Sequence, residues 1–73
     1  MKARIDAVYQ HYKDPHKRYR VLGFALDSET LAEMVIYEAL YPSPLGKTWV
    51  RPRAIFEEKI IFDGKRVDRF RRV

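Results

Sequence analysis

A chain of 73 residues without a cysteine has room for one small domain, and it can form neither a disulfide bond nor a thiolate metal site. Its formal net charge of +5 suits an anionic partner such as phosphate. No apolar run approaches the length of about 18 residues that a membrane span requires, and polar residues interrupt the first segment, so no signal-peptide core is expected. The sequence therefore predicts a single domain over residues 1–73, located in the cytoplasm and without membrane contact.

The charge is divided between an acidic middle and basic ends. Residues 1–20 contain six basic and two acidic residues, a net charge of +4, whereas residues 21–46 contain four acidic residues and no Lys or Arg. Residues 63–73 are again basic, with a net charge of +3 from five basic and two acidic residues. This distribution indicates either a basic surface that meets phosphate or a solvated surface that keeps a small domain in solution.

The N-terminal part contains one short extended segment followed by a turn. The sequence VYQHYK at residues 8–13 indicates a short strand or an extended arm. The sequence DPHK at residues 14–17 predicts a type I turn, because Asp suits the first position of that turn and Pro the second.

The clearest strand is RYRVLGFAL at residues 18–26. Alternation along it places on one face Tyr19, Val21, Gly23 and Ala25. The opposite face is also apolar toward the end of the strand, which predicts a central position in a sheet. A glycine inside the strand, Gly23, indicates a bend or a close approach of another backbone.

The segment after the DSET turn at residues 27–30 is ambiguous. The sequence LAEMVIYEALY at residues 31–41 contains good helix formers behind a capping serine. Its MVIY core is β-branched and aromatic, and a strand here would pair back on residues 18–26 as a hairpin. We therefore predict a strand, with a capped helix as the alternative.

A proline-containing loop and a further strand follow. Residues 42–47, PSPLGK, predict an irregular loop, and residues 48–51, TWVR, a short strand that Pro52 ends or places at a sheet edge. Near residues 53–58 the sequence predicts one helical turn, because Pro is favoured at the start of a helix. Ile55 and Phe56 are expected to turn inward from it.

The C-terminal part predicts a β-hairpin. An Asp-Gly pair between the apolar runs KIIF (59–62) and RVDRF (66–70) is a strong hairpin signal. Val67 and Phe70 are expected to anchor the last strand and to leave residues 71–73 as a frayed end. The whole order of elements is typical of a mainly β protein that forms a small, strongly bent antiparallel barrel.

Several of these segments occur in the order and spacing of a known family: HYK, YRVLGFA, SET, VIYEALY, WVRP, IF and DGKRVDRF. Over residues 9–70 the chain resembles the bacterial domain-of-unknown-function family numbered 1653. Members of that family look like compact SH3-like barrels, so the resemblance implies an SH3-like antiparallel barrel here. It implies no biochemical activity. The loop in YPSPLGKTW departs from the compact glycine-rich turn that the family has at this place.

The sequence contains no catalytic constellation. His11 and His16 are the only side chains whose ordinary pKa lies near neutrality, and two histidines five residues apart do not make a convincing zinc site. No nucleophile elbow, phosphate-binding glycine loop or metalloprotease motif is present. We therefore predict no catalytic residues, no metal and no cofactor.

Aromatic and basic side chains provide the strongest indication of function. Tyrosine is plentiful, with five residues, and each phenol requires water or a hydrogen-bonding partner. These rings either complete the core or line a groove that binds an extended peptide. The residues predicted for such a groove are His11, Tyr12, Lys13, Tyr37, Tyr41, Trp49 and Arg51.

Two classes of partner fit this candidate groove. The first is a peptide or protein, which would make the chain a non-catalytic binding module. The second is single-stranded DNA or RNA, whose bases would stack on the rings while Lys13, Arg51 and Arg53 reach phosphates. An enzyme or small-molecule-binding domain would require an enclosed pocket near His11. The sequence does not specify an oligomeric state.

Overall fold

The computed structural model describes residues 2–73, which form seven strands and one helical turn. In chain order these elements are β1 (Val8–His11), β2 (Arg18–Leu26), β3 (Glu33–Ala39), β4 (Thr48–Pro52), α1 (Arg53–Phe56), β5 (Lys59–Phe62), β6 (Lys65–Asp68) and β7 (Phe70–Arg72). The mainly β composition, the strand at residues 31–41 and the short helical turn are thus confirmed.

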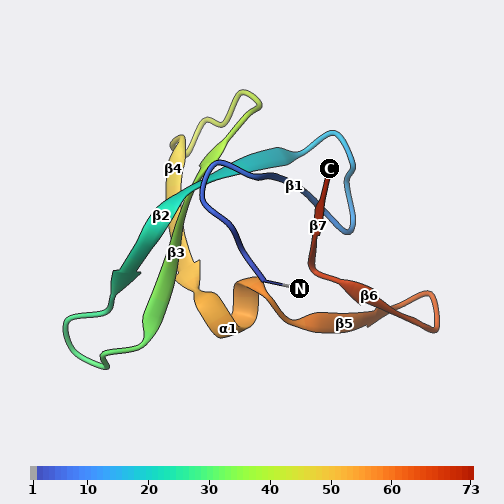
Figure 1. The fold of residues 1–73 in the computed structure, drawn as a ribbon. Coiled ribbons are helices and arrows are strands. Elements are labelled where there is room, and N and C mark those ends of the chain that lie inside the picture. The colour runs from blue at the N-terminus through green and yellow to red at the C-terminus, as the bar shows by residue number, and fades with distance from the viewer. Residues whose placement is uncertain (1) are drawn as a thin grey trace.

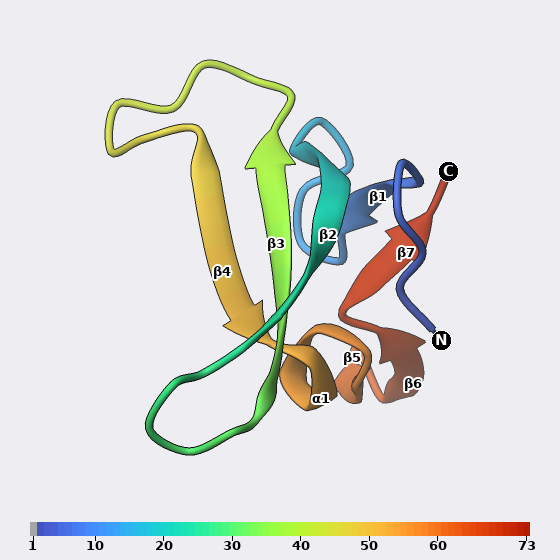
Figure 2. The same ribbon diagram turned by 60° about the vertical axis from the view of Figure 1, so that its left-hand side comes forward.

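All strand pairs are antiparallel, and they form two separate sheets. The larger sheet has the order β4-β3-β2-β1-β7, and β5 and β6 form a hairpin of their own. The larger sheet bends strongly between β2 and β1, and the hairpin extends away from it at the C-terminal side (Figures 1 and 2). This arrangement leaves β4 and β7 as the two edges of the larger sheet.

The closed barrel that the sequence predicted is not formed by residues 2–73, since β4 and β7 do not pair with each other. The physical reason is the course of the chain after β4. There α1 turns the chain away from the edge, and β5 then pairs with β6 instead of with β4. The open end is covered by α1 and by the N-terminal segment, in which Ala3 is buried (Figure 1).

The β2–β3 hairpin contains an irregularity that corrects the predicted alternation of β2. Val21 lies opposite Tyr37, but Gly23 lies opposite Ile36, so the register shifts between Val21 and Gly23. The bend predicted at Gly23 takes this form. Because a one-residue shift exchanges the two faces of a strand, Gly23 and Ala25 do not continue the buried face of Tyr19 and Val21.

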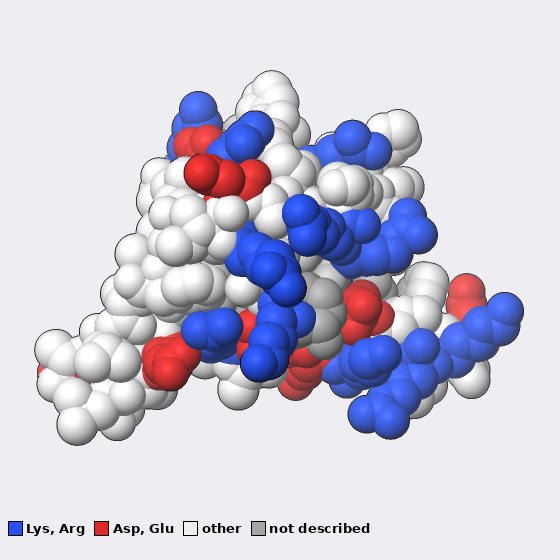
Figure 3. Space-filling model, in the orientation of Figure 1, with Lys and Arg blue, Asp and Glu red and all other residues white. Residues whose placement is uncertain are grey.

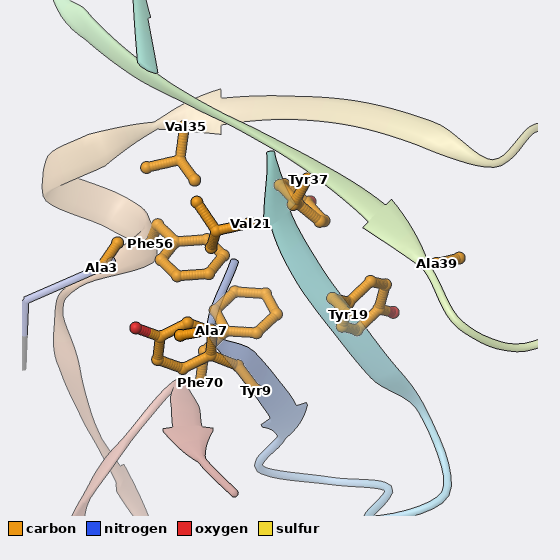
Figure 4. Close-up of a cluster of buried hydrophobic side chains, with 10 residues drawn as sticks. All are labelled: Ala3, Ala7, Tyr9, Tyr19, Val21, Val35, Tyr37, Ala39, Phe56 and Phe70. Carbon is orange, nitrogen blue, oxygen red and sulfur yellow. The ribbon is translucent and has the colours of Figure 1, made fainter. Parts of the chain in front are cut away.

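The core is a cluster of aromatic rings with small aliphatic side chains around it (Figure 4). The rings of Phe56 and Phe70 stack with centroids 4.3 Å apart and planes 7° from parallel. Tyr9 meets Phe56 edge to face at 5.5 Å, and its hydroxyl accepts a hydrogen bond of 3.0 Å from the Arg4 amide. Every one of these rings removes a large area from water, which a domain of this size requires.

The helical turn buries only one of the two residues that were expected to face inward. Phe56 is fully buried, whereas Ile55 is 42% exposed. Consecutive residues of a helix point about 100° apart, so a four-residue turn against a small core can bury only one of them. No helix within residues 2–73 is long and apolar enough to cross a membrane.

The C-terminal hairpin forms around the predicted turn, but its second strand ends at Asp68, with Phe70 in β7 of the larger sheet, and the frayed end does not form. Phe62 pairs with Lys65 across Asp63 and Gly64, whose φ angles of 52° and 72° are those of a type I′ turn. Residues 71 and 72 belong to β7, which pairs with β1, and the Val73 amide donates to the Val8 carbonyl at 3.0 Å. The predicted fray is wrong because β1 offers an unpaired edge to this segment.

Candidate binding groove

One open groove of about 320 Å³ collects aromatic and basic side chains on the concave face of the larger sheet. We call it the Trp49 groove, and it is lined by Lys17, Tyr19, Tyr37, Tyr41, Ser43, Pro44, Leu45, Trp49 and Arg51. Its volume lies at the lower end of the range of about 300–1,000 Å³ that is typical of ligand sites.

The strand register explains why these side chains meet. Tyr37 of β3 lies opposite Trp49 of β4, and Val35 lies opposite Arg51. Side chains directly opposite each other in an antiparallel pair share a face. Because Val35 and Tyr37 are buried toward the core, Trp49 and Arg51 must also project onto the concave face. The β3–β4 loop, residues 40–47, supplies the outer wall.

The tyrosines in the groove are held by one another. The hydroxyls of Tyr19 and Tyr41 lie 2.7 Å apart in a hydrogen bond, and their rings meet edge to face at 5.4 Å. Burial raises the pKa of Tyr19 far above its ordinary value, and the hydrogen bond to Tyr41 adds to the effect. The Tyr19 phenol is therefore neutral in the physiological range, and the two rings present a fixed aromatic wall.

The charged side chains in the groove are both cations. The Lys17 ammonium lies 5.7 Å from the centre of the Tyr41 ring, and the Arg51 guanidinium lies 5.3 Å from the centre of the Phe70 ring. Two carboxylates of β3 are taken by other cations: Glu33 pairs with Arg53 at 3.0 Å and Glu38 with Lys47 at 3.9 Å. With no acidic residue in its lining, the groove has a positive potential.

The predicted site residues divide into three groups. Tyr37, Tyr41, Trp49 and Arg51 line the Trp49 groove. His11 borders it, because its ring meets Phe70 edge to face at 5.4 Å beside Arg51.

Tyr12 and Lys13 lie elsewhere. The Tyr12 ring packs on Phe62 of the C-terminal hairpin with centroids 5.3 Å apart. The Lys13 ammonium lies 5.7 Å from the centre of the Tyr12 ring. Strand β1 ends at His11, so Tyr12 and Lys13 lie in the bend that follows, where the Tyr12 ring contacts the His11 ring with centroids 4.6 Å apart.

Sequence reasoning missed the loop that walls the groove. Ser43, Pro44 and Leu45 line it, and Leu45 is 86% exposed. An exposed leucine between two prolines and a glycine is a signal that the sequence did contain, but the segment was predicted only as an irregular loop.

His11 is held in its neutral form. The pKa of His11 is lowered, first by burial and then by the positive charge of Arg51, with Arg69, Lys13 and Lys17 adding smaller contributions. Its Nδ1 accepts a hydrogen bond of 3.2 Å from the Lys13 amide, which requires that nitrogen to be unprotonated. Within the described residues, no group of three or more His, Cys, Asp or Glu is placed to hold a metal ion.

The fold and the groove define the class of molecule as a small antiparallel β domain with an open aromatic and cationic groove. Residues 7–72 match the family described as "Protein of unknown function (DUF1653)", and the chain belongs to this family. It is similar to the crystal structure of a DUF1653 protein from Bordetella bronchiseptica, with 31% sequence identity and a TM-score of 0.82. That match covers 93% of this chain and 85% of the other. Comparison with curated proteins finds no match.

Proposed function

We propose that the chain is a non-catalytic binding module whose Trp49 groove takes an extended acidic peptide segment of a partner protein. The observation that carries this proposal is the composition of the groove, which combines four aromatic rings with Lys17 and Arg51 and contains no carboxylate. Rings give such a site apolar contact area, and unpaired cations select an anionic occupant.

The position of the groove beside a sheet edge favours an extended peptide. Strand β4 carries Trp49 and Arg51 and is one of the two edges of the larger sheet. A peptide strand added along an edge forms main-chain hydrogen bonds, while its alternate side chains enter neighbouring pockets. A peptide along β4 would place such side chains between Trp49 and the loop residue Leu45.

The bent sheet and the single helical turn are also consistent with an SH3-like module. The proposal retains that relationship, which the family resemblance implied. In small modules of this kind a shallow aromatic surface is sufficient, because an extended peptide loses little conformational entropy on binding.

The sole tryptophan of the chain provides the readout. We expect an array of short peptides, in which apolar residues alternate with acidic or with basic ones, to capture the domain on the acidic members only. Titration of a captured peptide should then change the emission of Trp49, because that side chain lies in the groove.

Two leucine variants make a matched pair for this test. Leu45 lines the groove and is 86% exposed, and Leu26 lies outside it and is 63% exposed. We expect Leu45→Ala to weaken peptide binding by about tenfold, the value of one buried leucine side chain, and Leu26→Ala to leave it unchanged. Equal binding by both variants, or capture on basic peptides alone, would refute the proposal.

A further inference from the structure

A second groove, which shares no lining residue with the Trp49 groove, lies between β1 and the C-terminal hairpin. We call it the Tyr12 groove. It has a volume of about 230 Å³ and is lined by Gln10, Tyr12, Phe62, Val67, Asp68 and Arg71. We propose that this groove binds single-stranded nucleic acid, a partner different from the one proposed for the Trp49 groove.

Two rings form the aromatic part of the Tyr12 groove: Phe62, which is exposed, and Tyr12, which is half-buried and contacts the His11 ring at 4.6 Å. Tyr12 and Phe62 meet edge to face, with centroids 5.3 Å apart and planes at 74°. Phe62 lies at the end of β5, is 40% exposed and is not a member of the buried core cluster. A free aromatic surface of this kind is what an unpaired base stacks on.

Cations surround these rings. Arg71 lies opposite Gln10 on the neighbouring strand, and Lys65 lies opposite Phe62 across the hairpin. The Lys13 ammonium lies 5.7 Å from the centre of the Tyr12 ring. None of these three takes part in an ion pair among residues 2–73; the pairs there involve Lys47, Arg53, Lys59 and Arg69.

One carboxylate also lines the groove, and it has a cationic neighbour of its own. Asp68 lies 3.9 Å from the Lys59 ammonium, and its side chain is 25% exposed. The groove and its rim therefore keep a positive balance. In the space-filling view Lys and Arg side chains gather over the hairpin and along the side of the molecule that carries β7, whereas the β2–β3 turn is nearly free of them (Figure 3).

The combination of rings and separate cations favours nucleic acid over an acidic protein. Each nucleotide of a single strand offers both a base that stacks and a phosphate that takes a cation, so Phe62 and its neighbour Lys65 match one nucleotide unit. An acidic peptide matches this pattern only where apolar residues alternate with acidic ones, whereas every nucleotide of a single strand carries both groups. A duplex keeps its bases inside and would leave Phe62 uncovered.

The test is the fluorescence anisotropy of a labelled oligothymidylate strand titrated with the whole chain. Binding through three phosphates predicts a loss of affinity of about twentyfold between about 50 mM and about 200 mM salt. We expect Phe62→Ala to weaken binding by about tenfold and Phe62→Trp to retain it, because the tryptophan restores a stacking surface. Arg71→Gln should weaken binding and make the salt dependence shallower.

Lys17→Gln is the matched control for Arg71→Gln. It removes the same charge from a side chain that lines the Trp49 groove, and we expect it to leave oligonucleotide binding unchanged. The proposal fails if Lys17→Gln weakens binding and Arg71→Gln does not, since the strand would then lie in the Trp49 groove.

It also fails if polyglutamate competes as well as the oligonucleotide and Phe62→Ala binds normally, since the surface would then take any polyanion. Phe62→Ala and Arg71→Gln leave the peptide proposal untouched, because both residues line the Tyr12 groove and Leu45 lines the Trp49 groove.

Discussion

Phe70 connects the core to the Trp49 groove. Its ring stacks on Phe56 at 4.3 Å inside the core, and the His11 ring and the Arg51 guanidinium lie 5.4 Å and 5.3 Å from it. Two groove-side polar groups are thus positioned by a residue that is itself 1% exposed. A change in the packing of Phe70 would therefore move His11 and Arg51 together.

The neutral state of His11 predicts a pH dependence of stability. Because the pKa of His11 is lowered in the folded state by burial and by Arg51, the unfolded chain binds the proton more readily in the window below the ordinary value of about 6.5. The free energy of unfolding is therefore unaffected by His11 above that value, and it decreases as the pH falls through the window and the unfolded chain takes up the proton. The free energy of unfolding, measured by chemical denaturation, should therefore be lower at pH about 5 than at pH about 7.5.

Substitution of each histidine separates this effect from others. His11→Gln should remove the pH dependence between these two values, whereas His16→Gln should keep it, because His16 is exposed in the β1–β2 turn. A dependence that persists in His11→Gln would assign the titration to another group.

At the scale of elements, two glycines differ in backbone conformation but not in the space around them, so substituting each of them separates the effect of φ from that of crowding. Gly64 has a φ angle of +72° in the hairpin turn, Gly23 is not in the left-handed region, and a Cβ at either position would meet nothing within 4 Å. Gly64→Ala should destabilise the β5–β6 hairpin by about 1 kcal/mol, because an L side chain disfavours this φ. Amide hydrogen exchange of residues 59–68 would report the change.

Gly23→Ala is the control at this scale. It should leave exchange in the hairpin unchanged and should not lower the melting temperature, since alanine has fewer unfolded conformations than glycine. Similar destabilisation by both substitutions would show that the side chain, and not the φ angle, is responsible.

Local signals predicted the elements better than their mutual arrangement. The β-branched run in residues 33–39 and the Asp63-Gly64 pair determine a strand and a type I′ hairpin locally, and both are present. The exposed Ile55 and the register shift before Gly23 depend on contacts between distant segments. No local pattern specifies such contacts, which is why the barrel was predicted closed and the faces of β2 were predicted to alternate throughout.

At the scale of the whole molecule, the candidate site also combines residues that are close in the chain with residues that only the fold brings near. Tyr37, Tyr41, Trp49 and Arg51 come from β3, β4 and the residues that follow β3, and the pairing of these two strands brings them to one groove. Tyr12 was placed in that groove by composition alone, but it follows the end of β1 and lines the second groove together with Phe62. Tyr19 was predicted only to lie on one face of its strand, and it both belongs to the buried core cluster and lines the groove.

The open end of the larger sheet depends on one carboxylate that joins distant parts of the chain. Glu57 Oε2 accepts a hydrogen bond of 2.7 Å from the Ala3 amide and one of 3.0 Å from Arg53 Nε. Arg53 in turn pairs with Glu33 of β3 at 3.0 Å. This network holds the N-terminal segment over α1, where the sheet does not close on itself.

Glu57→Gln should therefore weaken the whole fold. Burial alone would raise the pKa of Glu57, but the hydrogen bonds from the Ala3 amide and from Arg53 outweigh it, and the pKa is lowered. A lowered folded pKa gives stability that is present above the unfolded value of about 4.3 and is lost as the pH falls through the folded value. The variant should lose about 1–2 kcal/mol at neutral pH, the value of a hydrogen bond to a charged group.

Urea denaturation at pH about 6 and about 3 would measure both effects, because the lowered pKa makes the wild type lose the Glu57 contribution on acidification. Glu29→Gln is the matched control. Glu29 is exposed in the β2–β3 turn, so this variant should behave as the wild type does at both pH values. In Glu57→Gln the difference in the free energy of unfolding between the two pH values should shrink, since glutamine does not titrate.

If Glu57→Gln and Glu29→Gln unfold at the same urea concentration, the carboxylate does not hold the N-terminal segment in place. The buried side chains around Phe56 must then close the open end of the sheet by themselves.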